Sequence, residues 1–130
     1  MTTLVLTNGL FFEREINKER TLEDLQKIVG GYIEIPFLSE RFYAEEIDII
    51  INEEGKLIEE CKPSIAVVRK GTDEILDILY GNVVFASHNY EGETVGLTER
   101  QEEIVLEELE TEATLSNNKG KSYEVKVLYI

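Results

Sequence analysis

The side chains best suited to chemistry in this sequence are isolated cations beside predicted helix starts. Arg69 and Lys70 stand just before Thr72, which we expect to cap a short helix. Free backbone N–H groups at a helix start point outward and attract anions, and two adjacent cations add to that attraction. The pattern predicts a phosphate-binding position, with a solvated turn and a helix cap as the alternative. Arg100, in the first turn of a later predicted helix, is a second candidate, and a surface ion pair with a glutamate is its alternative.

Aromatic side chains with a polar edge can stack on a nucleobase. The candidates for stacking are Tyr32, Tyr80, Phe85 and Tyr90, and ordinary packing against a sheet is the alternative for each. Asn82 and Ser87 flank a predicted strand, where an amide and a hydroxyl can read the edge of a base. The predicted ligand-binding set is therefore Arg69, Lys70, Thr72, Tyr80, Asn82, Phe85, Ser87, Arg100 and Tyr32.

We find no arrangement of residues typical of a catalytic or metal site. His88 is the only histidine and Cys61 the only cysteine, too few for a structural zinc site. The sequence has no Gly-x-Ser-x-Gly motif, no Walker loop and no glycine-rich dinucleotide motif after a strand. Paired glutamates leave a hydrolytic or magnesium site open as an alternative, although they fall in predicted turns and on solvated faces. We expect no catalytic residues, no metal and no cofactor, hence a protein that binds and is not an enzyme.

The charge balance narrows the choice of partners. The chain has 130 residues, the size of a single domain, and 42% of them are apolar, enough for one core. Asp and Glu number 27 against 13 Lys and Arg, for a net charge of −14, which repels nucleic-acid backbones and anionic membranes. We therefore expect no duplex DNA and no membrane as partners. The single cysteine, the lack of a signal-peptide pattern and the lack of a long apolar run predict a cytoplasmic protein.

The apolar pattern predicts an α+β fold, with a mostly antiparallel sheet and two to three helices packed on one face. Strands at 4–6 and 11–16 flank Asn8-Gly9, which is typical of a hairpin turn. A helix starts at Thr21, which we expect to cap it, and ends at Gly30-Gly31. Strands are expected at residues 32–38, which Pro36 places at a sheet edge or ends, and at residues 47–51, with a return strand at 56–58.

The second half of the chain continues the mixture of strands and helices. Ile75, Leu76 and Leu79 are the apolar positions expected for the short helix that begins at Thr72, and Gly81 ends it. We expect a strand at 82–87 and a polar loop at 88–96. Thr98 and Gln101 form a capping box that opens a helix to about Leu109. A loop at 116–122 leads to a final strand at 123–130.

Three segments carry a family resemblance through their order and spacing. They are Leu22-x-x-Leu25-Gln26-x-x-Val29-Gly30-Gly31-Tyr32-Ile33-Glu34, then Ile47-Asp48 followed by Asn52-Glu53-Glu54-Gly55-Lys56-Leu57, then Ile78-x-x-Gly81-Asn82-Val83-Val84 with Glu91-Gly92-Glu93 and Leu97-Thr98. Together they span roughly residues 20–100. The sequence resembles a family of small phage, prophage and plasmid proteins that is described as a domain of unknown function.

The resemblance implies a context in which small accessory proteins frequently counter host immunity. One role that fits is a sponge, an oligomer that sequesters the cyclic nucleotide signals of defence systems such as CBASS without cleaving them. Another is an acidic mimic of nucleic acid that inhibits a nuclease, a restriction enzyme or a CRISPR effector. A structural or regulatory phage protein without a defence role is the third. We favour the sponge, because the acidic residues are spread through the chain. Predicted strand edges near Pro36 and at 123–130 favour a homo-oligomer.

Overall fold

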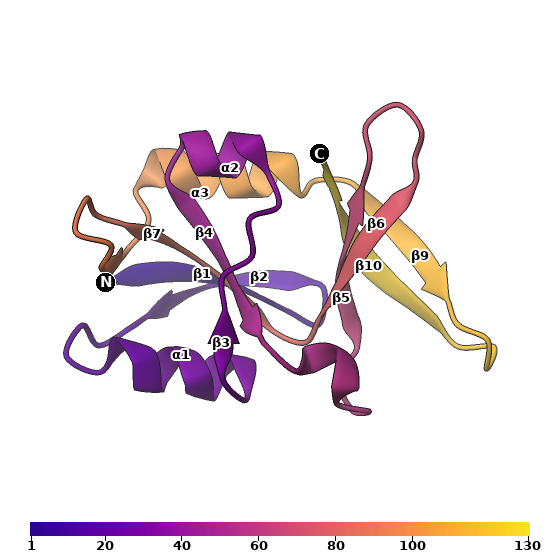
Figure 1. Ribbon diagram of the computed structural model, residues 1–130, viewed down its shortest axis with the longest axis horizontal. Helices are drawn as coiled ribbons and strands as arrows, with labels where there is room; N and C mark the ends of the chain where they lie inside the picture. The colour runs from indigo at the N-terminus through magenta and orange to yellow at the C-terminus, as the bar shows by residue number, and fades with distance from the viewer.

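The computed structural model describes residues 1–130. Its helices are α1 (Thr21–Val29), α2 (Glu40–Ala44) and α3 (Glu99–Glu108), with a short 3-10 helix, η1 (Gly55–Leu57). Its strands are β1 (Thr2–Thr7), β2 (Leu10–Glu15), β3 (Ile33–Glu34), β4 (Ile47–Asn52), β5 (Pro63–Val68), β6 (Ile75–Tyr80), β7 (Val83–His88), β8 (Thr94–Val95), β9 (Glu112–Ser116) and β10 (Ser122–Tyr129). Figure 1 shows these elements arranged around two sheets.

The first sheet is antiparallel throughout, with strands in the order β2-β1-β7-β4-β3 and with β8 paired to β7. Its hairpin β1–β2 turns at Asn8 and Gly9, whose φ angles of 50° and 79° are those of the turn that matches strand twist. The predicted hairpin is therefore confirmed. The strand before Pro36 lies at a sheet edge, as predicted, but it is only the two residues of β3.

The second sheet has strands in the order β6-β5-β10-β9, and only the β5–β10 pair is parallel. The predicted strand at 123–130 is confirmed as β10. Its expected position at an exposed edge is wrong, because β10 runs between β9, which pairs with residues 122–126, and β5, which pairs with residues 126–129. Homo-oligomerisation thus loses that support and stays a prediction.

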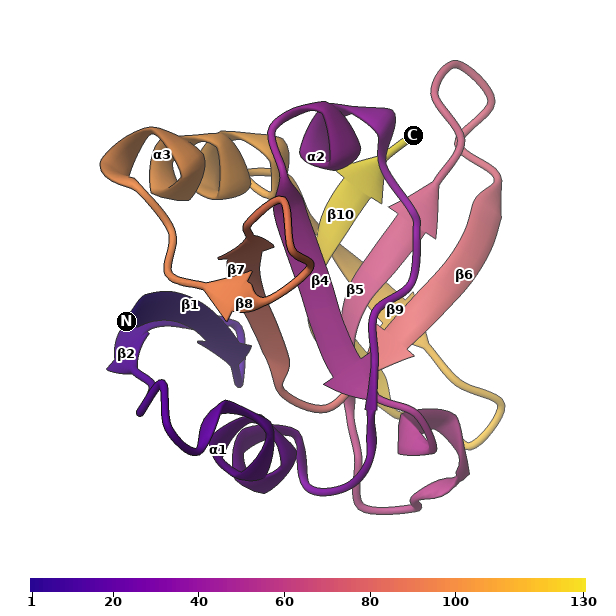
Figure 2. The same cartoon turned by 60° about the vertical axis from the view of Figure 1, so that its left-hand side comes forward.

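Two apolar clusters lie on opposite faces of the first sheet. On one face α1 packs through Leu25, Ile28 and Val29 against strand residues such as Ile50. On the other face α2, α3 and the second sheet share one cluster around Phe85. Burying a side chain the size of Leu25 contributes about 1.5–3 kcal/mol. In Figures 1 and 2, α1 lies on one side of the first sheet and α2 and α3 on the other.

The predicted fold class is confirmed: the protein is α+β and its sheets are mostly antiparallel. The arrangement differs from the expected single sheet with helices on one face. Four strands, β5 and β6 from the middle of the chain and β9 and β10 from its end, build a second sheet, which shares the α3 face of the first. None of the helices has the length and apolar character needed to cross a bilayer.

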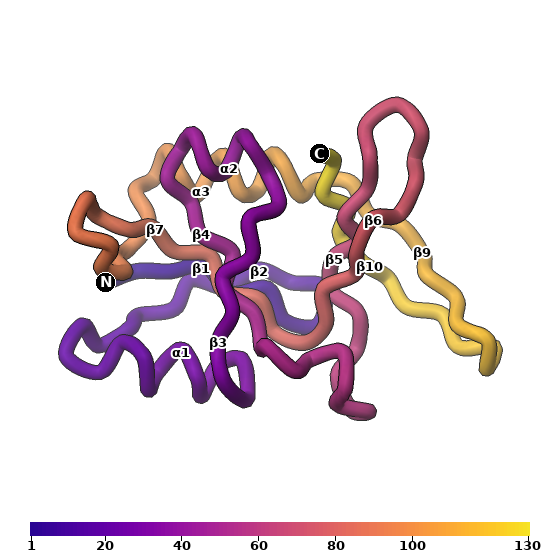
Figure 3. The backbone as a smooth tube through the Cα atoms, viewed as in Figure 1, coloured from indigo at the N-terminus to yellow at the C-terminus, as the bar shows by residue number.

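Residues 75–80 form strand β6, and the helix predicted to begin at Thr72 is wrong. The spacing of Ile75, Leu76 and Leu79 suits a helix or a strand. Which of the two forms depends on whether a neighbouring strand is present to pair with. β5 offers that partner: Ala66 pairs with Ile78 and Val67 with Asp77. Thr72 lies in the turn between the two strands, where its hydroxyl accepts a hydrogen bond from the Glu74 N–H at 3.3 Å. The tube in Figure 3 follows this long hairpin out to its tip.

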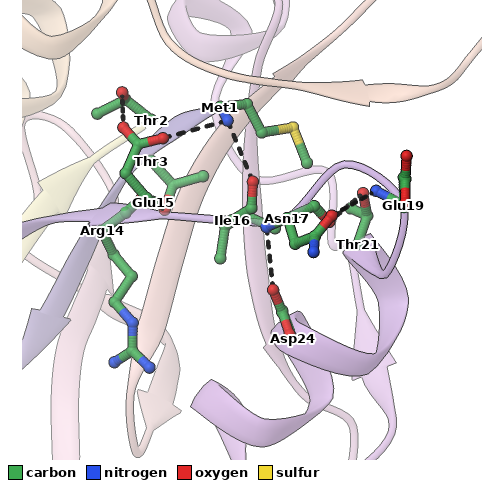
Figure 4. A network of polar contacts seen from close by, with 10 residues as sticks. All are labelled: Met1, Thr2, Thr3, Arg14, Glu15, Ile16, Asn17, Glu19, Thr21 and Asp24. Carbon is green, nitrogen blue, oxygen red and sulfur yellow. Dashed lines mark hydrogen bonds and ion pairs between the residues drawn. The ribbon is translucent and has the colours of Figure 1, made fainter.

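The start of α1 is also held differently from the prediction. Thr21 does not cap the helix; its hydroxyl donates to the carbonyls of Asn17 and Lys18 at 3.4 and 3.2 Å. The Asp24 carboxylate instead accepts from the Asn17 N–H at 3.0 Å, which ties the first turn back to the preceding loop. Figure 4 shows this network, together with the Glu15 carboxylate that accepts from the Met1 amino group at 3.3 Å.

Of the other local predictions, some are confirmed and some are wrong. The capping box of α3 is confirmed, with Thr98 and Gln101 exchanging both hydrogen bonds. The return strand expected at 56–58 is wrong, because the N–H groups of Leu57 and Ile58 bond to carbonyls three residues back and form η1. Helix α2 and strand β9 were not predicted; both are short and β9 is mostly exposed, so neither has a clear apolar period.

Candidate functional site

The predicted ligand-binding residues do not gather at one place. Arg69, Lys70 and Thr72 lie in the β5–β6 turn, whereas Tyr80 and Asn82 lie at the other end of β6. A strand of six residues spans about 20 Å, so the two groups belong to separate surfaces. In Figures 1 and 2 the β5–β6 turn lies at the same end as α2 and the end of β10, and α1 lies at the opposite end.

Phe85 and Ser87 are core residues, and their predicted place in a binding site is wrong. Phe85 is 0% exposed and meets the Phe42 ring edge to face at 6.2 Å between centroids. The buried Ser87 hydroxyl donates to the Glu46 carbonyl at 2.7 Å and accepts from Gln101 at 3.1 Å. Neither side chain is free to contact a ligand, because β7 is the central strand of the first sheet.

The anion-binding argument for Arg69 and Lys70 changes with the local structure. No helix starts at Thr72, so helix N–H groups do not add to the attraction. The turn is closed by the Arg69 N–H bonding to the Glu74 carbonyl at 2.9 Å, and the Arg69 guanidinium lies 3.2 Å from the Glu74 carboxylate. Both partners of that ion pair are exposed, so it is weak and leaves Arg69 available.

A cleft at this end of the molecule brings Arg69 and Lys70 together with a third cation. It has a volume of about 340 Å³ and lies between the β5–β6 turn, the segment before α2, α2 itself and the end of β10; we call it the hairpin cleft. Its lining residues are Phe37, Leu38, Ser39, Glu40, Arg41, Arg69, Lys70, Leu76, Glu108, Tyr129 and Ile130. Its three cationic side chains outnumber its two carboxylate side chains, in contrast to the chain as a whole.

Sequence reasoning missed Arg41 and Phe37, which stand on either side of Ser39. Ser39 accepts a hydrogen bond from the Phe42 N–H at 3.2 Å and thereby caps α2. A serine three residues before an apolar residue is the signal that could have revealed this helix. Arg41 lies in α2, and Phe37, which is 67% exposed, lies just before the cap. The hairpin cleft thus offers cations for an anion and an uncovered aromatic ring.

A second, larger cleft of about 640 Å³ lies at the carboxyl end of α1, and we call it the α1 cleft. Asn82 lines it, with Lys27, Lys62 and Glu60 at its charged rim. Residues 27–30 and 81–82 of the first and third resemblance segments line it, together with residues 8–9, 60–64 and 122–124. Asn82 donates its amide to the Ile28 carbonyl at 2.9 Å, and Asn52 donates to the Val29 carbonyl at 3.2 Å.

These two asparagines satisfy carbonyls that the end of a helix leaves without partners. The approach is close at Gly31, where a Cβ atom would lie 2.9 Å from the Asn52 amide nitrogen. The Tyr32 carbonyl in turn accepts from the Glu53 N–H at 2.8 Å. The resemblance segments therefore form one structural junction between α1, β4 and the β6–β7 turn. Asn82 is part of it, and its amide is already engaged.

The remaining predicted residues stand apart from the hairpin cleft. Tyr32 is 71% exposed in the loop after α1, and Tyr80 is half-buried with its main chain against Gly55. Tyr90 is exposed in the loop between β7 and β8. Arg100 is exposed in the first turn of α3 and lines neither cleft. Arg69 and Lys70 are thus the two predicted residues that the hairpin cleft unites.

Negative charge is concentrated where α3 faces β2. Burial raises the pKa of Glu102, and the nearby carboxylates of Glu13 and Glu99 raise it further. Glu13 comes from β2, whereas Glu99 and Glu102 stand one turn apart on α3. We call these three residues the α3 carboxylates. No group of three or more His, Cys, Asp and Glu side chains in the structure has the arrangement of a metal site.

A comparison with family models gives one finding. The model described as "Domain of unknown function (DUF3846)" matches residues 1–110 of this chain. The match extends from β1 to the end of α3 and includes all three resemblance segments. No curated protein and no solved structure gives a significant match.

Proposed function

The chain belongs to the family described as Domain of unknown function (DUF3846), and we propose, from the cleft itself, that this protein binds a cyclic nucleotide in the hairpin cleft. It holds the nucleotide without cleaving it. In the phage setting that the sequence resemblance suggests, such binding would withdraw an immune signal from the host. The protein is then a sponge and not an enzyme.

The observation that carries this proposal is the meeting of Arg41, Arg69 and Lys70 beside the exposed ring of Phe37. Guanidinium groups bind phosphate oxygens through two parallel hydrogen bonds, and an uncovered aromatic ring stacks on a base. Pockets for small ligands measure about 300–1,000 Å³, a range that includes the 340 Å³ of this cleft. A ligand with phosphates and flat rings matches both features.

The test is calorimetric titration with a panel of cyclic dinucleotides and cyclic trinucleotides. We expect Arg41→Gln and Arg69→Gln each to weaken the binding of a panel member by about 10- to 100-fold, the loss of one charged hydrogen-bond pair. Arg100→Gln is the matched control, since it removes the same charge outside the cleft. A panel without any binder, or equal effects of all three variants, would count against the proposal.

A second candidate function is favoured by the α3 carboxylates. Burial, and then the carboxylates of Glu13 and Glu99, raise the pKa of Glu102, and three carboxylates this close together form a concentrated negative surface that suits a basic partner. In this alternative the protein imitates nucleic acid and occupies the channel of a nuclease or a restriction or CRISPR effector. The hairpin cations would have no part in it.

Charge-matched variants separate the two functions. The triple variant Glu13→Gln, Glu99→Gln, Glu102→Gln removes the α3 carboxylates, and Glu53→Gln, Glu59→Gln, Glu91→Gln removes the same charge elsewhere. A mimic predicts that only the first triple relieves inhibition of a restriction endonuclease in a DNA-cleavage assay. If both triples act alike, net charge and not this surface is responsible.

A further inference from the structure

Residues 35–38, which link β3 to α2, divide two adjoining hollows. On one side is the hairpin cleft. On the other is a smaller hollow of about 100 Å³, which we call the strap pocket; Phe37, Leu38 and Ser39 line both. The strap pocket is mostly apolar, and its polar side chains are the Asp48 carboxylate, the His88 ring and the hydroxyls of Ser39 and Tyr43. In Figure 2 the segment between β3 and α2 runs beside β4, the strand that supplies Asp48.

His88 is held in one orientation by Asp48. Its Nδ1 lies 3.0 and 3.1 Å from the two oxygens of the Asp48 carboxylate. An ionised carboxylate only accepts hydrogen bonds, so in the neutral ring Nδ1 carries the proton and Nε2 has a free lone pair. The side chain of His88 is 36% exposed, which leaves the ring open to a ligand. In the neutral ring, His88 Nε2 is therefore an acceptor in the strap pocket lining that has no hydrogen-bond partner in the protein.

Two exposed rings stand beside this acceptor. Phe37 and Tyr43 meet edge to face with 5.2 Å between centroids, and they are 67% and 68% exposed. Such rings lose little freedom when a flat ligand stacks on them. A hollow of about 100 Å³ admits a flat ring but not a complete nucleotide, whose phosphates would have to lie outside it. The neighbouring cations of the hairpin cleft stand where those phosphates would be.

We propose that the strap pocket is the base subsite of the nucleotide site and selects a base with an exocyclic amino group. The amino group of adenine is a hydrogen-bond donor, which complements the His88 Nε2 lone pair. This inference rests on the proposed function of the hairpin cleft, because the same ligand fills both hollows. His88 is a specificity residue in this site, whereas Arg41 and Arg69 hold the phosphates whatever the base.

The test compares cyclic di-AMP with its analogue in which hydrogen replaces each 6-amino group, two ligands with the same phosphates and ring size. We expect the wild-type protein to bind cyclic di-AMP about tenfold more tightly, the worth of one hydrogen bond to a site that would otherwise leave its acceptor unpaired. His88→Phe keeps a ring in the pocket and removes the acceptor, so it should make the two affinities equal. Arg41→Gln should weaken both ligands by the same factor.

A second measurement does not depend on any variant. Because the protein has a single histidine, its ¹⁵N ring signals are assigned without ambiguity. The Nε2 signal should shift on addition of cyclic di-AMP and stay in place with the analogue. Equal affinities for the wild-type protein, or an unmoved Nε2 signal in a protein that binds cyclic di-AMP, would overturn this inference and leave the hairpin cleft intact. If the wild-type protein binds no cyclic nucleotide at all, the proposed function itself is overturned.

Discussion

Glu102 is the residue at which electrostatics acts most plainly against folding. Burial and the carboxylates of Glu13 and Glu99 raise its pKa, so the folded state holds the proton of Glu102 more firmly than the unfolded state does. At neutral pH the folded state must therefore keep a charge that it disfavours. We expect Glu102→Gln to raise the free energy of unfolding at pH 7 by roughly 0.5 kcal/mol, the scale of a surface charge interaction. Urea denaturation measures the change.

The pH dependence of stability tests the direction of this effect independently. An acid with a raised pKa in the folded state contributes stability below its unfolded pKa and loses it as pH rises through the folded pKa. The advantage of Glu102→Gln should thus be present at pH 7 and vanish near pH 4. Glu103→Gln, on the exposed side of the same helix turn, is the control and should show no such trend. A constant difference across this pH range would refute the explanation.

Asn52 and Asn82 are expected to matter for stability and not for ligand binding. Asn52→Ala and Asn82→Ala each leave a carbonyl at the end of α1 without a partner, which costs about 1–3 kcal/mol for a buried group. The larger loss should be at Asn52, which is 5% exposed and also accepts from the Glu54 N–H at 2.8 Å. Asn118→Ala, in the exposed β9–β10 turn, is the control. A thermal midpoint unchanged in all three variants would argue against this role.

Sequence reasoning at the residue scale depends on residue type. Arg69 and Lys70 stood out as cations in an acidic chain; the hairpin cleft contains both, and their role in binding stays a prediction. It failed where burial matters: Phe85 and Ser87 have the types of binding residues but lie in the central strand β7. It also missed Arg41 and the His88–Asp48 pair, because 40 residues separate those two partners and only sheet pairing brings them together.

At the scale of elements, the connection between α2 and β4 carries a local backbone strain. Glu46 has φ of 58°, in the left-handed region that glycine adopts most easily. We expect Glu46→Gly to stabilise the protein by about 0.5–1 kcal/mol, the relief of left-handed strain less the extra freedom of glycine when unfolded. Glu45→Gly, at φ of −96°, is the matched control and should destabilise it. Chemical denaturation of both variants checks this, and equal destabilisation would contradict it.

Elements were predictable from the sequence when a local signal identified them. The Asn8-Gly9 hairpin, the glycine end of α1 and the capping box of α3 each depend on residues within one turn, and each is confirmed. Residues 75–80 carry no such signal, since their apolar spacing fits a helix or a strand. The hydrogen bonds offered by β5 decide in favour of the strand, and β5 is itself completed by a strand near the end of the chain. These pairing partners are too distant in the sequence to be inferred from the residues around 75–80.

At the scale of the whole molecule, the boundary of the family match falls inside one sheet and its apolar cluster. The match ends at residue 110, just after α3, yet β10 lies beyond it and pairs with β5 in the interior of the second sheet. Leu128 of β10 is 0% exposed in the same cluster as Ile65 and Val67 of β5. Residues 111–130 are therefore expected to be part of the core and not an appendage.

Removing residues 111–130 should abolish cooperative folding, because β5 would lose a strand partner and Ile65 and Val67 would lose the cover of Leu128. Near-ultraviolet circular dichroism and thermal unfolding of the 1–110 fragment measure this. The control shortens the β9–β10 turn, replacing residues 117–121 with Asn-Gly; Ser116 and Ser122 already face each other across the hairpin, so a two-residue turn closes it. That variant should unfold cooperatively. A 1–110 fragment that melts with the midpoint of the full chain would show that the matched segment is complete by itself, and that the second sheet needs no more than β5 and β6.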